Sequence, residues 1–206
     1  MCARELLPVL GQSQPERADA ARNRQKIIEV TARMIAERGA DQLSLDEVAR
    51  EACVGVGTVY RRFRDKAGLL WALIDERERR FQAAFLTGPP AVGPGAPPAE
   101  RVRAFLGALV DRVVEQQDLF VLLELGAPKA RFNGPYRVHH THLAGLLSEV
   151  RPDADARFLA DALLATANAH LILYQRAERG MRVETIKSCI DALAQAILSA
   201  NGPVPT

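Results

Sequence analysis

The sequence predicts an all-α protein of about nine helices, in which a small three-helix domain precedes a larger C-terminal helical domain. Through most of the chain, apolar residues recur at the i, i+3, i+4, i+7 spacing of an amphipathic helix. Proline and glycine separate these stretches and are densest at residues 87–100. No segment alternates apolar and polar residues with the period of two that is typical of a half-buried strand.

The N-terminal stretch has helix-breaking residues and no sustained helical period, so we expect a disordered arm there. The first helix is expected over residues 19–38, and Gly39 ends it as a C-cap. The predicted divisions of the chain are therefore an arm (1–18), an N-terminal domain (19–75) and a C-terminal domain (76–206) that contains a Pro/Gly-rich loop (87–100).

The stretch SLDEVAREACVGVGTVYRRFRDK, residues 44–66, has the pattern of two short helices joined by a tight turn. Ser44 followed by Glu47 is typical of a capping box at the start of a helix. Residues 53–55 are too few for anything but a turn, and Gly55 tolerates the left-handed backbone that such turns use. Two helices joined in this way form a helix-turn-helix, whose second helix can enter the major groove of DNA.

The second helix of this motif combines an apolar set with a basic end. The apolar set repeats the i, i+3, i+4, i+7 spacing of a helix: Val56, Val59, Tyr60 and Phe63. Between Arg61 and Lys66 the chain has four cations and one anion, next to the hydroxyl of Thr58 and the bare backbone of Gly57. Such groups suit phosphate oxygens, so the pattern favours DNA binding over a merely solvated basic face.

The stretch AREACVGVGTVYRRFRDKAGLL resembles the DNA-binding signature of TetR-type bacterial transcriptional regulators, and the resemblance runs from about Arg24 to about Ile74. Two residues depart from the family's pattern: Cys53 stands at the usual turn glycine, and Gly55 stands where a polar residue is common. A non-glycine residue at positive φ costs roughly 1–2 kcal/mol, so we expect an adjusted turn.

The resemblance implies a homodimeric transcriptional regulator, a repressor, that binds a palindromic double-stranded operator and is released by a small-molecule effector. It also implies which residues touch DNA. Phosphate contacts are expected from Ser44, Thr58, Tyr60 and Lys66, and groove contacts from Gly55, Val56, Arg61 and Arg62, with Gly57 leaving room for close approach. Either arginine is suited to read guanine.

The C-terminal domain offers apolar side chains and a few polar groups on separate predicted helices. The candidate lining of an effector pocket is Phe105, Leu109, Phe120, Leu123, Glu124, His139, His142, Leu143, Asn168, His170 and Tyr174. Such a lining suits a mostly hydrophobic effector with one or two polar groups. The alternative is that these side chains fill the core and satisfy one another.

The last two predicted helices, residues 152–179 and 183–200, are apolar on more than one side. A helix of this kind buries one side in its own subunit and the other against a partner, which favours a homodimer over a monomer. The predicted stripes are Ala160, Leu164, Ala167 and Leu171 on the first helix, and Ile186, Ile190, Leu193 and Ile197 beside Cys189, Ala192, Ala196 and Ala200 on the second.

Composition argues against several classes of protein. The formal net charge is only +2, whereas an architectural protein that coats DNA needs an excess of positive charge. No apolar run reaches the roughly 18–20 residues that cross a bilayer, and no signal-peptide pattern is present, so we expect a cytoplasmic protein without membrane contact.

No motif of a nucleotide-binding loop or a hydrolase nucleophile occurs, so we expect no enzyme activity, no catalytic residues, no cofactor and no metal. The alternative function is a redox- or metal-responsive DNA-binding regulator. In that case Cys53, or the histidines between His139 and His142, would act as the sensor.

Overall fold

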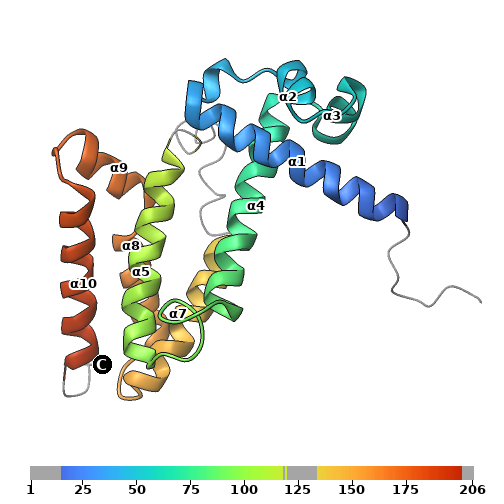
Figure 1. The fold of residues 1–206 in the computed structure, drawn as a ribbon. Coiled ribbons are helices and arrows are strands. Elements are labelled where there is room, and N and C mark those ends of the chain that lie inside the picture. The colour runs from blue at the N-terminus through green and yellow to red at the C-terminus, as the bar shows by residue number, and fades with distance from the viewer. Residues whose placement is uncertain (1–14, 118, 120–133, 201–206) are drawn as a thin grey trace, which may run out of the picture. The chain divides into compact units, whose positions relative to one another are not determined.

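The computed structural model of the protein describes residues 15–117, 119 and 134–200. Every regular element in these ranges is a helix, which confirms the prediction of an all-α fold (Figure 1). The chain divides into two compact units, Met1–Glu76 and Arg77–Thr206, which we call the N-terminal unit and the C-terminal unit.

The N-terminal unit is built from α1 (Pro15–Arg38), the short 3-10 helix η1 (Ala40–Gln42), α2 (Leu45–Glu51), α3 (Val56–Phe63) and the first part of α4 (Lys66–Thr87). Gly39 ends α1 with a φ of 82°, as its predicted capping role requires. The apolar faces of these helices meet in one core, whose fully buried members are Ile27, Val48, Ala49, Val59 and Leu69. This core fixes the orientation of α3.

Helix α1 begins earlier than the sequence indicated. It starts at Pro15, so the expectation of a disordered arm is wrong for residues 15–18; residues 1–14 lie outside the described part of the chain. Proline suits the first helical position, because its fixed φ is already helical and its missing N–H would have had no partner there. Pro15 therefore marks the start of α1, whereas from the sequence we interpreted it as a helix-breaking residue.

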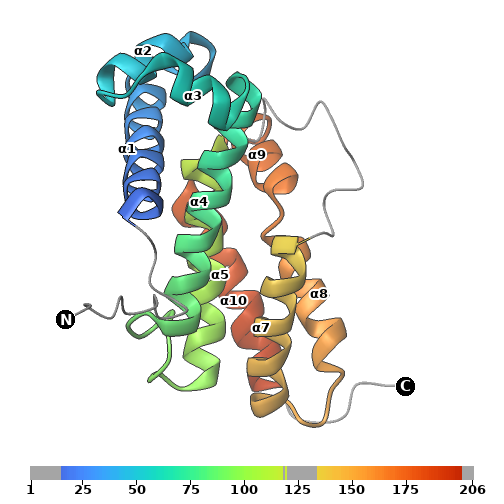
Figure 2. The same ribbon diagram turned by 90° about the vertical axis from the view of Figure 1, so that its right-hand side faces the viewer.

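The C-terminal unit contains the rest of α4, α5 (Pro98–Glu115), α7 (Gly134–Val150), α8 (Ala156–Thr166), α9 (Ala169–Ala177) and α10 (Val183–Ser199). Helix α5 packs on both α7 and α10, and α7 runs beside α8 (Figure 2). The core between them is aliphatic and aromatic, and its fully buried side chains include Phe85, Phe105, Leu143, Leu147, Leu163 and Ile172.

The single long helix expected over residues 152–179 is wrong. It is divided into α8 and α9, because Asn168 caps α9 by accepting a hydrogen bond from the backbone N–H of His170 at 3.0 Å. Asp155 caps α8 in the same way, accepting from the N–H groups of Arg157 and Phe158. The side chains of asparagine and aspartate form hydrogen bonds with nearby backbone N–H groups. These residues are therefore favoured at the starts of helices over helix interiors.

By length and composition alone, Ala156–Ala177 is apolar enough to be considered as a membrane span. In the structure this segment is not one helix, and Ala160, Leu163 and Leu164 of α8 are buried in the core of the C-terminal unit. A core helix passes the same test of composition, so the segment is weak evidence for a membrane.

Candidate functional site

The turn between α2 and α3 is strained at Cys53. This residue has a φ of 55°, whereas Gly55 has an extended backbone with φ −63° and ψ 135° and serves as the N-cap of α3. Gly55 therefore does not use the left-handed conformation that a glycine tolerates. The exposed Cys53 takes it instead, at the position where the TetR-type pattern has glycine.

The predicted capping box is not formed. Ser44 is the N-cap of α2, but its side chain makes no cap hydrogen bond. Glu47 is instead 3.6 Å from Arg50 and 4.0 Å from Arg38, in two ion pairs. The Glu47 carboxylate therefore pairs with neighbouring cations. The negative charges of Asp46 and Glu47 in the first turn still stabilise the N-terminal end of α2.

Helix α3 is held to the N-terminal unit along one side only. Of the apolar set, Val59 and Phe63 are buried, whereas Val56 is 44% exposed and Tyr60 is 46% exposed. The rest of the outer side is also exposed: Gly55, Gly57, Arg61 and Arg62. A methyl group added at Gly57 would meet no atom within 4 Å, so this glycine leaves the backbone open rather than making room for packing.

Two of the predicted DNA contacts are tied to the protein's own backbone. The Arg62 guanidinium donates to the carbonyl oxygen of Ala20 in α1 at 2.5 Å. The Lys66 ammonium donates to the carbonyl oxygen of Asp41 at 2.7 Å. Both cations brace the unit around α3, whereas Arg61 is exposed and makes no such backbone contact within the described residues.

The C-terminal unit has an open cavity of about 700 Å³ between α5, α7, α8 and the start of α9. Its apolar walls are Leu109, Val113, Pro135, Leu164, Ala165, Ala167, Ala169 and Leu171. Its polar groups are Arg112, Tyr136, His139, Asp161 and Asn168. A cavity of this size and composition fits a small amphipathic molecule.

Two of these polar groups, Arg112 and His139, form a buried charged cluster with Glu78. Glu78 of α4 forms an ion pair with Arg112 of α5, and its Oε1 lies 2.9 Å from Nε2 of His139 of α7. Gln82 donates to the same oxygen at 2.8 Å. The exposed fractions of the three side chains are 6%, 12% and 7%. The Arg112 guanidinium also lies over the ring of Phe81, 5.6 Å from its centroid.

The partners of Glu78 decide its charge. Burial alone would raise the pKa of Glu78, but the hydrogen bond with His139 and the charge of Arg112 outweigh it and lower that pKa below its ordinary value. Burial lowers the pKa of Arg112, and the Glu78 carboxylate partly offsets this. The cluster therefore holds an ionised carboxylate and an ionised guanidinium out of water.

The structure brings three of the predicted pocket residues to the cavity, namely Leu109, His139 and Asn168. Phe105 and Leu143 are buried in the core, and His142 packs on Phe85 with 4.5 Å between ring centroids. His170 and Tyr174 are exposed on α9. Phe120, Leu123 and Glu124 lie outside the described residues.

Sequence reasoning missed Arg112, Tyr136 and Asp161. Arg112 follows Leu109 by three residues, so it lies on the same side of α5 as an apolar wall of the cavity. A cation at that spacing was the available signal. Tyr136 of α7 donates a hydrogen bond from its hydroxyl to the carboxylate of Asp161 of α8, and no local pattern indicates this contact.

The sensor residues of the alternative function do not come together. His139 is turned to Glu78, whereas His142 packs on Phe85 and Phe105. Within residues 15–117, 119 and 134–200, no three His, Cys, Asp or Glu side chains gather where a metal ion would bind. Cys53 and Cys189 are both exposed free thiols.

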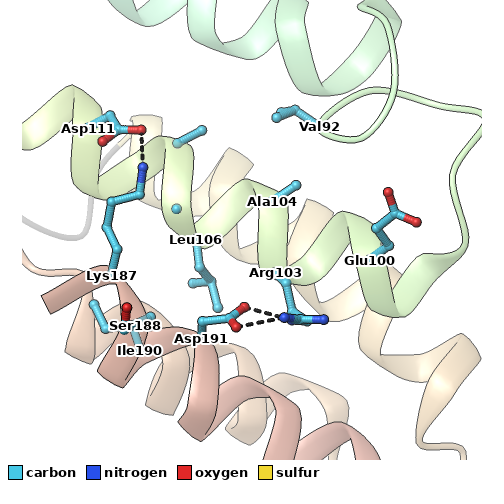
Figure 3. A pocket seen from close by; sticks show the side chains of 12 residues that line it. Val92, Glu100, Arg103, Ala104, Leu106, Asp111, Lys187, Ser188, Ile190 and Asp191 are labelled. Atoms are coloured by element: carbon cyan, nitrogen blue, oxygen red, sulfur yellow. Dashed lines mark hydrogen bonds and ion pairs between the residues drawn. The ribbon is translucent and has the colours of Figure 1, made fainter. Parts of the chain in front are cut away.

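A second hollow of about 610 Å³ lies between α5 and α10 (Figure 3). Two ion pairs cross it: Arg103 contacts Asp191 through two hydrogen bonds of 2.6 and 2.7 Å, and Lys187 donates to Asp111 at 2.6 Å. These four side chains satisfy one another, so this groove offers a ligand fewer unused polar groups than the cavity does.

Comparison with known proteins places the chain among regulators. Residues 27–73 match the family described as bacterial regulatory proteins, tetR family. An HTH-type transcriptional regulator of Staphylococcus aureus (strain bovine RF122 / ET3-1) is 25% identical over 174 residues, which are 84% of this chain and 92% of that protein.

Solved structures share the fold. A transcriptional regulator from Rhodococcus sp. Rha1 has 22% identity and a TM-score of 0.64, over 88% of this chain and 99% of that one. The transcriptional regulator FadR from Bacillus subtilis was solved in complex with stearoyl-CoA. It has 18% identity and a TM-score of 0.60, over 85% of this chain and 97% of that one. Together with the helix-turn-helix geometry, the matches confirm the predicted resemblance: residues 27–73 are similar to the DNA-binding domain of the tetR family of bacterial regulatory proteins, and the curated relatives that match most of the chain are HTH-type transcriptional regulators.

Proposed function

We propose that this regulator is a cytoplasmic homodimeric repressor that binds a palindromic operator and is released by a small, mostly apolar effector. The observation that carries the DNA-binding part is the outer side of α3. There Val56, Tyr60 and Arg61 are exposed on a helix that Val59 and Phe63 anchor to the core. An anchored helix with exposed aromatic and cationic groups suits insertion into a major groove.

The two arginines of α3 have different roles in this proposal. Arg61 reads a base, because its exposed guanidinium is available to the two acceptors of a guanine. Arg62 and Lys66 hold α1 and η1 against α3 through backbone carbonyls, and add positive charge near the phosphates. Ser44, Thr58 and Tyr60 complete the phosphate contacts, and Gly55, Val56 and Gly57 lie against the groove.

This assignment predicts different consequences for the two arginines. Sites selected from random DNA with the wild-type protein should define the operator. Arg61→Ala should weaken binding to it about tenfold, which is roughly 1.4 kcal/mol, and should relax the preference at one base pair in each half-site. Arg62→Ala should weaken binding to all sequences alike, without changing the preferred site. Fluorescence anisotropy measures both effects.

A matched control is Arg137→Ala, which removes an exposed cation from α7 of the C-terminal unit. It should leave operator binding unchanged. If Arg61→Ala selected the same sites with wild-type affinity, Arg61 would not be the residue that reads the base.

The proposed dimer uses α8 and α10, although not with all of the predicted stripes. Ala160, Leu164 and Ala167 are buried in their own subunit, as are Ile186 and Ile190. The exposed side of α10 carries small residues and one leucine: Cys189, Ala192, Leu193, Ala196 and Ala200. Phe158 of α8 is 66% exposed. Small side chains let helices approach closely, and such a pairing gives a closed two-fold dimer.

We expect sedimentation equilibrium at micromolar concentration to give the mass of a dimer. Ala196→Arg should give a monomer with much weaker operator binding, because only one half-site is then engaged. Ala83→Arg, the same change at an exposed position of α4, should remain dimeric. A wild-type monomer would contradict this part of the proposal.

The cavity of the C-terminal unit is the proposed effector site. Its aliphatic walls suit an apolar body, and its polar groups suit one or two polar functions. The structurally similar FadR was solved with stearoyl-CoA, a ligand with a long apolar chain. Release follows if the effector binds more tightly to a conformation of the protein that does not fit the operator.

A further inference from the structure

We propose that the effector is an amphipathic carboxylate, and that its carboxylate binds Arg112 from the cavity in competition with Glu78 of α4. The inference rests on the proposed function, because it assigns the chemistry of the same cavity and the step that leads to release. It is carried by the position of Arg112, which lines the cavity and is at the same time the partner of Glu78.

Arg112 has donors to spare for a second carboxylate. A guanidinium carries five N–H groups, and the ion pair with Glu78 engages Nη2. Nε of Arg112 is buried without a hydrogen-bond partner. A buried donor in this condition costs free energy, so Glu78 alone does not satisfy the guanidinium of Arg112.

The remaining polar groups of the cavity also favour an anion. Among the described residues that line it, Arg112 is the one lysine or arginine. His139 is turned to Glu78, and Asn168 already caps α9. A cationic effector would need Asp161, but that carboxylate is 56% exposed and is held by Tyr136 and His140.

The competition connects the cavity to α4. Two carboxylates on one guanidinium repel each other, and the effector therefore weakens the ion pair between Arg112 and Glu78. Glu78 belongs to the part of α4 in the C-terminal unit, and the same helix begins at Lys66, three residues after the end of α3. A weaker Glu78 contact loosens α4 against α5, which is a change that the helix-turn-helix experiences through its own chain.

The test compares straight-chain carboxylates, from butanoate to hexadecanoate, with the alcohols of the same length. Thermal shift and calorimetry measure binding to the wild type and to two variants. We expect carboxylates to bind and the matched alcohols to bind at least tenfold more weakly. Glu78→Gln should bind the best carboxylate at least tenfold more tightly, because Arg112 then lacks its own counter-charge. Glu78→Gln/Arg112→Met should lose the preference for carboxylates.

The matched control is Asp191→Asn, which removes the carboxylate partner of Arg103 in the exposed groove of Figure 3. It should bind carboxylates as the wild type does. Equal binding of alcohols, or of carboxylates to the wild type and the double variant, would overturn the inference. So would the absence of binding across the whole series. Should Glu78→Gln fail to fold, the double variant, which has no buried charge left unpaired, decides alone.

Operator binding separates this inference from the proposed function. The selected operator should be bound by the wild type and released by the best carboxylate, and Glu78→Gln should bind it more weakly without any ligand. A protein that selects no DNA site, yet prefers carboxylates through Arg112, would contradict the proposed repressor and leave the ligand chemistry standing. If neither the carboxylate nor the substitution Glu78→Gln changed the affinity for the operator, the link through α4 would be refuted.

Discussion

Arg112→Met is expected to lower the free energy of unfolding by about 3–5 kcal/mol at neutral pH. The substitution keeps a long apolar side chain beside Phe81 but removes the cation that faces Glu78. Glu78 is only 5% exposed, so its carboxylate would stay buried with hydrogen bonds from His139 and Gln82 but without a counter-charge. Urea unfolding at pH 7.5 measures the loss.

The pH and a second substitution show whether charge is the cause. In Arg112→Met the carboxyl of Glu78 gains a proton more readily, so the deficit should shrink as the pH falls toward 5. Glu78→Gln/Arg112→Met should recover most of the stability, because no unpaired charge is left. A double variant as unstable as Arg112→Met would mean that packing, not charge, is what Arg112 supplies.

Arg103→Met is the matched control, since it makes the same substitution in the ion pair with Asp191. Arg103 is 42% exposed, so water solvates both charges when the ion pair is lost, and the pair contributes little to the free energy of unfolding. We expect a far smaller change in unfolding than for Arg112→Met. The contrast tests whether burial sets the contribution of an ion pair in this unit.

The helix-turn-helix was the most predictable part of the chain, because its signals are local. Spacing alone indicated the buried Val59 and Phe63, and the charge between Arg61 and Lys66 indicated the exposed end. What sequence could not supply was the use of each cation. Nothing in the local pattern shows that Arg62 reaches Ala20 or that Lys66 reaches Asp41, because these contacts join residues 42 and 25 positions apart.

The C-terminal unit was less predictable for the same physical reason. Apolar periodicity indicated its helices, but it did not show that residues 160, 164 and 167 of the predicted stripe pack in their own core. Periodicity tells which side of a helix is apolar and not what covers it. The cluster of Glu78, Arg112 and His139 joins three helices, so no stretch of sequence contains it.

His142 is expected to make the protein less stable as the pH falls from about 6.5 to about 4. Burial, with smaller contributions from the charges of Arg101 and His139, lowers the pKa of His142 to about 4. The folded protein keeps this ring neutral, whereas the unfolded chain protonates it near pH 6.5. The stabilisation is therefore complete above pH 6.5 and is lost as the pH falls through that window, about 2 kcal/mol in all after allowance for partial exposure.

His142→Phe should remove this slope, and it keeps a ring against Phe85 and Phe105, whose centroids lie 4.5 and 5.2 Å away. It also removes Nε2 of His142, which is buried without a hydrogen-bond partner, so stability at pH 5 should rise above that of the wild type. His142→Asn should flatten the slope too, but with lower stability at every pH because the ring is lost. Urea unfolding of all three proteins between pH 4 and 8 decides the matter, because curves that stay parallel would show that His142 does not titrate in this window.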